Sequence, residues 1–377
     1  MSAPLAAAAA LSPASDPRRA GRLAAAEAAG RLGRGRVRGL LLMASGDHGV
    51  ELEEVAQGAR AQIPDATLLV VGAESCLTAQ GDTLGDDGVL ALALATPIEA
   101  RIAPSLGALS KILGEGAGPP RPAVLLSNLL DADALARVAC AGAPLVGGTL
   151  ESGTPLLLVE PGREPRRGEA ALLRFGGGLR MATLSVEGVE RLTPFLAVGS
   201  SNGMLIETLG ERSALEALEA ATEGFEAPSQ VALLRRPGEA EPEAESRAGV
   251  PGGLLHRLVG LDPGRGAIWI DPPLPARAQI AFGRASASLA RREGARRLQI
   301  LLQEIGGGFP IAALPFECSA RARHPSGRPS LEFGPLRERF PALPIAGLRT
   351  GAQLVASGAR SEIVSQTSTL GLLYLPS

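Results

Sequence analysis

The sequence predicts a mixed α/β fold, α+β in its details, with two domains built from repeated strand–helix–strand–strand units. Two observations predict it. Continuous apolar runs alternate with segments of helical spacing, and this order recurs at least three times along the chain. The length of 377 residues also exceeds what one hydrophobic core usually holds. We therefore expect layered sheets with flanking helices.

The first unit opens with a clear helix start. Asp16 is a capping residue, and Pro17 follows it where a missing N–H costs little. The run GLLLMA is apolar at every position, as in a strand that is buried on both faces. The expected elements are a helix over residues 18–32, a strand over 39–44, a helix over 50–62 and a strand over 67–71 that ends at Gly72.

Two further units show the same order. The second is expected as a strand over 123–127, a short helix over 131–139, residues 144–146 leading into Gly147, and a strand over 155–159. The third is expected as a strand over 311–316, a short helix over 336–340, residues 344–346 leading into Gly347, and a strand at 354–355. The spacing of the units is too irregular for a solenoid.

The middle of the chain differs from these units. We expect strands over 180–186, 196–199, 204–207, 267–270 and 278–285, and helices over 213–222 and 286–303. The Asn202-Gly203 pair is typical of a tight hairpin. Residues 236–249 are acidic and contain proline, which predicts a solvated loop near a domain boundary. The expected division is an N-terminal strand and helix extension (1–35) and two domains (36–222 and 223–377).

Composition and motifs exclude several classes of function. The net charge of −2 argues against a nucleic-acid partner. No apolar run approaches the length of a membrane span, and the N-terminus lacks the positive start of a signal peptide. The three cysteines are sparse, as in a reducing compartment, so we expect a cytoplasmic protein. No ligand spacing for zinc, phosphate-binding loop or serine-hydrolase elbow is present, so we expect no metal and no cofactor.

Cys318 and the glycines after the strands each allow two interpretations. Cys318 is followed by Arg321, Arg323 and His324, which could activate a thiolate, but burial as a small apolar residue is the commoner fate. The glycines could serve only tight reversals between strands. Alternatively, their bare backbone could let a ligand approach. Three such turns would line one cavity if the units packed about a pseudo-symmetry axis.

Taken together, these residues resemble the FIST family, with its FIST N and FIST C domains. The resemblance rests on GLLLMASGDHG, IPDATLLVVGAESCLTAQGD and PAVLLSNLLDADALARVACAGAPLVGGTLESG in the first half. In the second half it rests on DPGRGAIWIDPPLPARAQIAFGRASA, FECSAR, PIAGLRTGAQL and SQTSTLGLLYL. It covers the chain from about residue 36. Two positions depart from the family pattern: Ala73 replaces a cysteine of the first turn, and Gln353 replaces an acidic residue.

The resemblance implies an intracellular sensory protein that binds small ligands, with amino acids suggested, and that signals through a separate protein. A binding protein is therefore expected rather than an enzyme. A Cys318-dependent hydrolase or transferase and a protein-binding scaffold remain open alternatives. In the first interpretation Arg321 holds a ligand carboxylate. The candidate ligand-binding residues are Gly72, Glu74, Ser75, Gly147, Gly148, Thr149, Asn202, Cys318, Arg321, Gly347, Thr350 and Gly351.

Overall fold

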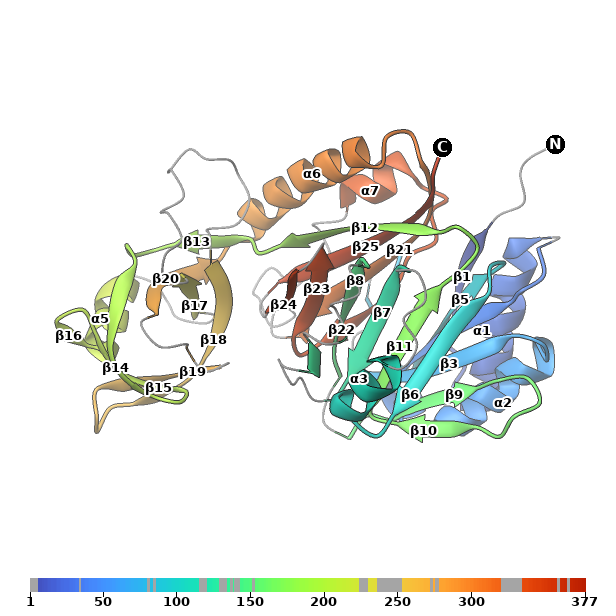
Figure 1. The fold of residues 1–377 in the computed structure, drawn as a ribbon, viewed down its shortest axis with the longest axis horizontal. Coiled ribbons are helices and arrows are strands. Elements are labelled where there is room, and N and C mark those ends of the chain that lie inside the picture. Colours follow the sequence, from blue (N-terminus) through green and yellow to red (C-terminus); the bar gives the residue numbers. More distant parts are fainter. Residues whose placement is uncertain are drawn as a thin grey trace.

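A computed structural model of the chain shows a large body of three repeats and a smaller β-barrel beside it (Figure 1). It describes residues 6–33, 35–79, 82–83, 86–114, 121–128, 134–135, 138, 143–150, 153–223, 230–235, 253–271, 274, 278–319, 334–357, 360–364 and 367–377. The expected loop 236–249, most of the expected helix 131–139, and Arg321 lie outside these residues.

The three repeats have the same order of elements. The first comprises β1 (Ala7–Ser12), α1 (Pro17–Leu32), β2 (Gly39–Ser45), η1 (Gly46–Gly49), α2 (Leu52–Gln62), β3 (Thr67–Ala73), β4 (Cys76–Thr78) and β5 (Gly88–Leu94). The second comprises β6 (Ile98–Ala103), α3 (Leu106–Gly114), β7 (Ala123–Ser127), β8 (Leu145–Thr149), β9 (Leu156–Val159), β10 (Arg166–Gly168) and β11 (Ala170–Phe175). The third comprises β12 (Arg180–Val186), α6 (Ala287–Glu304), β21 (Phe309–Cys318), α7 (Gly334–Arg339), β22 (Ala346–Thr350), β23 (Gln353–Ser357), β24 (Arg360–Val364) and β25 (Ser368–Leu375).

The strand orders of three sheets correspond position by position. They are β1-β5-β2-β3-β9-β10 in the first sheet, β6-β11-β7-β8-β23-β24 in the second and β12-β25-β21-β22-β4 in the third. Each sheet contains one parallel pair, formed by β2 and β3, by β7 and β8, or by β21 and β22. The strand that follows each pair joins the sheet of another repeat: β4 pairs with β22, β9 with β3, and β23 with β8. The repeats are therefore interlocked in a closed cycle.

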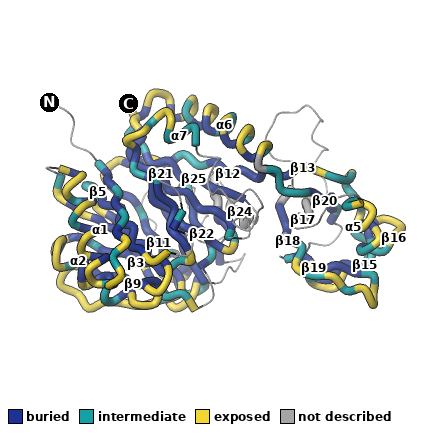
Figure 2. The backbone as a smooth tube through the Cα atoms, turned by 180° about the vertical axis from the view of Figure 1, so that it is seen from behind, coloured by how far each residue is buried: buried dark blue, intermediate teal, exposed yellow. Residues whose placement is uncertain are grey.

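All three sheets turn one face toward a shared central core. Leu41 and Met43 of β2 lie in that core together with side chains of β7, β8, β21 and β22. Leu40 and Leu42, on the opposite face of β2, pack instead against α1 and α2. Helix α3 covers the outer face of the second sheet, and α6 and α7 cover the third. Burial on both faces explains why these strands read as uninterrupted apolar runs (Figure 2).

The barrel is inserted into the third repeat between β12 and α6. Its elements are β13 (Val189–Arg191), β14 (Leu196–Asn202), β15 (Leu205–Leu209), β16 (Arg212–Ser213), α5 (Ala214–Thr222), β17 (Gln230–Arg235), β18 (Gly253–Asp262), β19 (Ala267–Asp271) and β20 (Gln279–Ala285). The antiparallel pairings run β14-β15-β19-β18-β17-β20 and return to β14, which closes the barrel. Its core is separate and includes Ile206, Ile268 and Phe282.

The expected fold class and the repeated strand–helix–strand unit are confirmed. Asp16 caps α1 as expected, since its carboxylate accepts a hydrogen bond from the Arg19 N–H at 2.6 Å. The expected strand ends need correction, because β3, β8 and β22 continue through the glycines at 72, 147 and 347. The barrel takes strands from both sides of the division expected after residue 222.

Candidate functional site

Three turns at the carboxyl ends of the parallel strand pairs are joined into one ring. We call it the turn ring: residues 74–75 between β3 and β4, residues 150 and 153–155 between β8 and β9, and residues 351–352 between β22 and β23. Each turn leads into a strand that joins another repeat's sheet. It therefore lies beside the carboxyl end of the second parallel strand of that repeat, which is β22, β3 or β8. Ligands of open α/β sheets bind beyond such carboxyl ends.

Main-chain hydrogen bonds connect each turn to the neighbouring repeat. The Arg349 N–H donates to the Ser75 carbonyl at 3.1 Å, and the Gly72 N–H donates to the Pro155 carbonyl at 3.4 Å. Between the second and third repeats, Thr149 N donates to the Ala352 carbonyl at 2.8 Å, and Ala352 N donates back to the Thr149 hydroxyl at 2.6 Å. The structure therefore brings together predicted residues from all three repeats.

The glycines of the parallel strands have a packing role that their sequence did not reveal. A Cβ at Gly147 would lie 1.8 Å from the Leu125 carbonyl oxygen, and one at Gly347 would lie 1.9 Å from that of Pro315. At Gly148 it would lie 2.5 Å from the Thr350 hydroxyl oxygen. These glycines are strand residues that allow close approach of neighbouring backbone and side chains, not the turns themselves.

A buried polar network lies behind the third turn. The Gln353 amide nitrogen donates to the Thr350 hydroxyl at 3.0 Å and to the Thr350 carbonyl at 3.2 Å. The Thr367 hydroxyl donates to the Gln353 side-chain oxygen at 2.9 Å. All three residues are buried. Sequence reasoning noted Gln353 only as a departure from the family pattern and did not place Thr367 in the site.

Cys318 lies at the end of β21, in register with Thr350. Its thiol is buried and is 3.5 Å from the Gly351 carbonyl oxygen, to which it donates. The main-chain N–H of Cys318 donates to the Thr367 carbonyl at 3.1 Å. Gly351 is exposed, so the buried network reaches the protein surface at this turn. Cys318 is therefore in the turn-ring region, as expected.

A buried ion cluster next to the turn ring was missed by sequence reasoning. The Arg349 guanidinium donates to the Asp82 carboxylate and lies 3.8 Å from the Glu317 carboxylate. All three side chains are almost completely buried. No local sequence signal distinguishes these charges from surface charges. Desolvating them is costly unless partners satisfy each polar atom.

Several buried polar atoms at this end have no hydrogen-bond partner among the described atoms. They include the Ser75 hydroxyl, the Asn128 side-chain oxygen, the Arg349 Nη1, the Asp82 Oδ1 and the Ser368 hydroxyl. Ser75 is fully buried, and Asn128 follows directly after β7 and is 8% exposed. Because buried polar atoms almost always have partners, such atoms at the strand ends are candidates for contacts with a bound polar molecule.

Cys76 occupies an apolar position beside the first turn. Its burial raises the pKa of the thiol from 9.0 to about 12, although hydrogen bonds with Ser45 and Thr83 act in the opposite direction. The thiol donates to the Met43 carbonyl at 3.3 Å. Cys76 is therefore a neutral thiol at physiological pH and cannot serve as a nucleophile there.

Two predicted residues lie apart from the buried network. Asn202 is exposed at the end of β14, in the barrel, where Gly203 follows with a φ of 62°. Glu74 belongs to the first turn but is exposed. Asn202 therefore serves the β14–β15 hairpin that its sequence indicated, rather than the turn ring.

The barrel joins the main body at the level of the turn ring. Val186, the last residue of β12, is in register with Ser368. Ser368 is in register with Glu317, which in turn pairs with Arg349. The chain therefore crosses to the barrel on the same side as the carboxyl ends of β21 and β22 (Figure 1).

Among the described residues, no three His, Cys, Asp or Glu side chains form a group that could hold a metal ion. No helix within the same residues has the length and apolar character to cross a membrane. No protein-family model matches the chain, and no curated protein matches it significantly.

Proposed function

We propose that the protein is a cytoplasmic sensory protein that binds a small polar molecule at the turn ring and signals through a separate protein. The observation that carries this proposal is the set of unpartnered buried atoms at the ring, those of Ser75, Asn128 and Arg349. Three segments far apart in the sequence meet there. The resemblance to the FIST family supports the same class of function, and the segments that carry it include Ser75, Asn128 and Arg349.

The chemistry of these atoms restricts the ligand. The Arg349 Nη1 is a donor and requires an acceptor, such as a carboxylate oxygen. The Asn128 side-chain oxygen is an acceptor and requires a donor, such as an amino group. The Ser75 hydroxyl can donate or accept a hydrogen bond. A small molecule with both kinds of group, such as an amino acid, fits this combination.

Calorimetric titration of the full chain with a panel of amino acids and related carboxylates tests the proposal. We expect one class of the panel to bind and Ser75→Ala to weaken that binding about tenfold, the effect of one lost hydrogen bond. Ser110→Ala is a matched control, because Ser110 is also buried but donates to the Gly107 carbonyl on α3.

The stability of the variant separates a binding role from a packing role. Because the Ser75 hydroxyl has no partner among the described atoms, removing it should leave the unfolding free energy unchanged or slightly higher. Absence of heat with every compound would contradict the proposed ligand class. Equal affinity in Ser75→Ala would remove Ser75 from the site, and equal affinity in Arg321→Ala would remove the predicted carboxylate clamp.

A further inference from the structure

A groove lies at the opposite ends of the same strands from the turn ring. Its volume is about 760 Å³, within the range of small-molecule sites. Pro122 and Pro144 line it, and each directly precedes the first residue of β7 or β8. The groove is therefore at the amino ends of this parallel pair, whereas the turn ring is at the carboxyl ends.

The charged residues of this groove are all cationic. Arg121 and Arg180 line it, and no carboxylate is among its described lining residues. Arg180 is exposed and forms no ion pair with the residues that the structure describes. Two guanidinium groups on one wall, of which only Arg121 contacts a carboxylate, concentrate anions in a groove.

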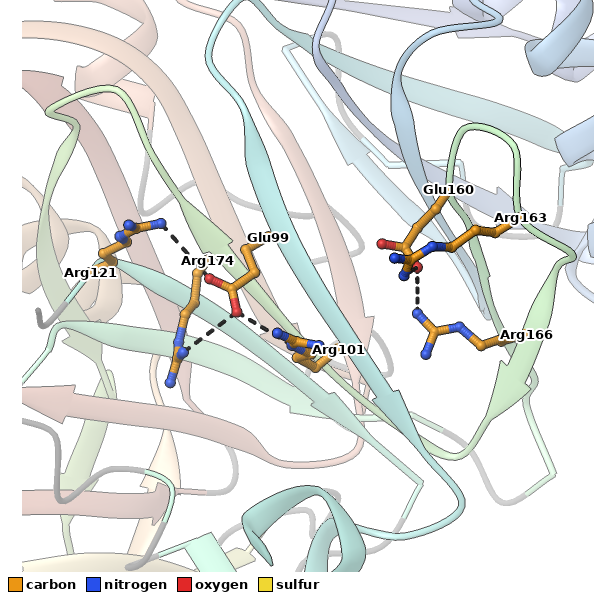
Figure 3. Close-up of polar contacts among 7 residues, drawn as sticks. All are labelled: Glu99, Arg101, Arg121, Glu160, Arg163, Arg166 and Arg174. Carbon is orange, nitrogen blue, oxygen red and sulfur yellow. Dashed lines mark hydrogen bonds and ion pairs between the residues drawn. The ribbon is translucent and has the colours of Figure 1, made fainter. Parts of the chain in front are cut away.

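The surroundings of Arg121 add to this positive charge. Glu99 is shared by three arginines: Arg101 at 3.3 Å, and Arg121 and Arg174 at 3.8 Å each (Figure 3). One carboxylate therefore faces three guanidinium groups, and Arg121 is held only loosely and remains 45% exposed. Together with Arg180, these residues make four arginines and one glutamate, so their combined charge is positive.

The remaining walls of the groove are apolar and include the glycines at 176–178. Phe175, Met181 and Tyr374 line it, together with prolines whose φ angles are fixed. Tyr374 is directly opposite Arg180 in the β12–β25 pairing, so an aromatic ring and a guanidinium are neighbours on one face. Such a surface offers an apolar group a preformed place beside a cationic one.

We infer that this groove binds a small organic anion with an apolar or aromatic part. The arginines receive the anionic group, and the proline and aromatic walls receive the rest. The site is independent of the turn ring, because it uses other residues at the other end of the sheet. Failure of either proposal therefore leaves the other standing.

Anilinonaphthalene sulfonate, an aromatic sulfonate whose fluorescence rises on burial, is a suitable probe. We expect it to bind the full chain at low salt, and Arg121→Gln/Arg180→Gln to weaken binding about tenfold or more. Raising the salt from ~0.05 M to ~0.5 M should weaken binding to the unmodified chain but hardly affect the double variant. Sulfate, which lacks an apolar part, should compete poorly.

Arg163→Gln/Arg166→Gln is the matched control. Those arginines are also exposed and share one acid, Glu160, but they belong to another part of the surface (Figure 3). The control should bind the probe like the unmodified chain, and unchanged circular dichroism should show that both double variants are folded. Binding unaffected by Arg121→Gln/Arg180→Gln, or weakened equally by the control, would overturn the inference, as would competition by sulfate as strong as that by an aromatic sulfonate.

Discussion

Cys76 shows how burial controls the chemistry of a single side chain. In the sequence this cysteine follows a strand and the turn after it. In the structure it contributes to the central core. Loss of solvation disfavours the thiolate, which is why its pKa rises to about 12.

The raised pKa of Cys76 predicts a loss of stability in alkali. The folded state retains the proton that the unfolded chain releases above pH 9, so the stabilisation is complete below that pH and falls toward pH 12. Urea unfolding from pH 8 upward should show this fall, and Cys76→Ala should remove about 1.4 kcal/mol of it per pH unit. Identical pH slopes for the two chains would contradict the assignment.

Gln353 should stabilise the third turn through its hydrogen bonds with Thr350 and Thr367. Gln353→Leu would leave both buried threonines short of a partner, and we expect the free energy of unfolding to fall by about 1–3 kcal/mol. Gln303→Leu, on the exposed side of α6, should change it by less than about 0.5 kcal/mol. Equal effects in urea titrations would mean that the network has no special contribution.

At the scale of elements, α1 and α2 show why small residues occur on certain helix faces. A Cβ at Gly58 of α2 would lie 1.9 Å from the Arg18 carbonyl oxygen of α1, and one at Gly21 would lie 2.2 Å from that of Val55. The two helices therefore approach closely at their glycines. Ala-rich composition predicted α1 itself but not this contact.

Gly58→Ala tests that close approach. Helix propensity alone predicts a gain of about 1 kcal/mol for this change. We expect the opposite sign, because the methyl group would meet backbone that cannot move without separating α1 from α2. Gly30→Ala is the control, since nothing lies within 4 Å of a Cβ there and the propensity gain should appear. Thermal unfolding that shows stabilisation in both variants would disprove the close contact.

At the scale of the whole molecule, the barrel is attached through two adjacent chain crossings. The Ser286 N–H donates to the Gly188 carbonyl at 2.8 Å, so the two crossings are next to each other. The barrel core shares no residue with the cores of the three repeats. The repeats should therefore fold without the barrel.

Replacing residues 189–285 by a short Gly-Ser linker tests this independence. We expect the shortened chain to remain folded, with cooperative thermal unfolding and the circular dichroism of a mixed α/β protein. A shorter cut that removes β7–β11 (residues 123–175) should nevertheless abolish folding, because β9 is needed in the first sheet. A shortened chain without a cooperative transition would show that the repeats depend on the barrel.

The sequence by itself determined the local elements. Apolar runs such as GLLLMA, the cap at Asp16 and the recurrence of strand, helix and strand are read within short windows, where the physical signal is local. The recurring units also predicted equivalent turns after the strands. The sequence shows glycine at positions 147 and 347, but it does not show that the close approach of neighbouring backbone requires glycine there.

Only the tertiary structure decided which strands meet. The exchange of β4, β9 and β23 among the repeats, the closure of the barrel across residue 222, and the burial of Arg349 with Asp82 and Glu317 all join residues far apart in the chain. The backbone hydrogen bonds of a sheet are nearly the same for any apolar strand, so they do not select a partner. A charged residue that becomes buried cannot be distinguished in the sequence from one that stays exposed. These choices follow from the packing of the complete chain, because it is the shared core that selects among partners that are locally equivalent.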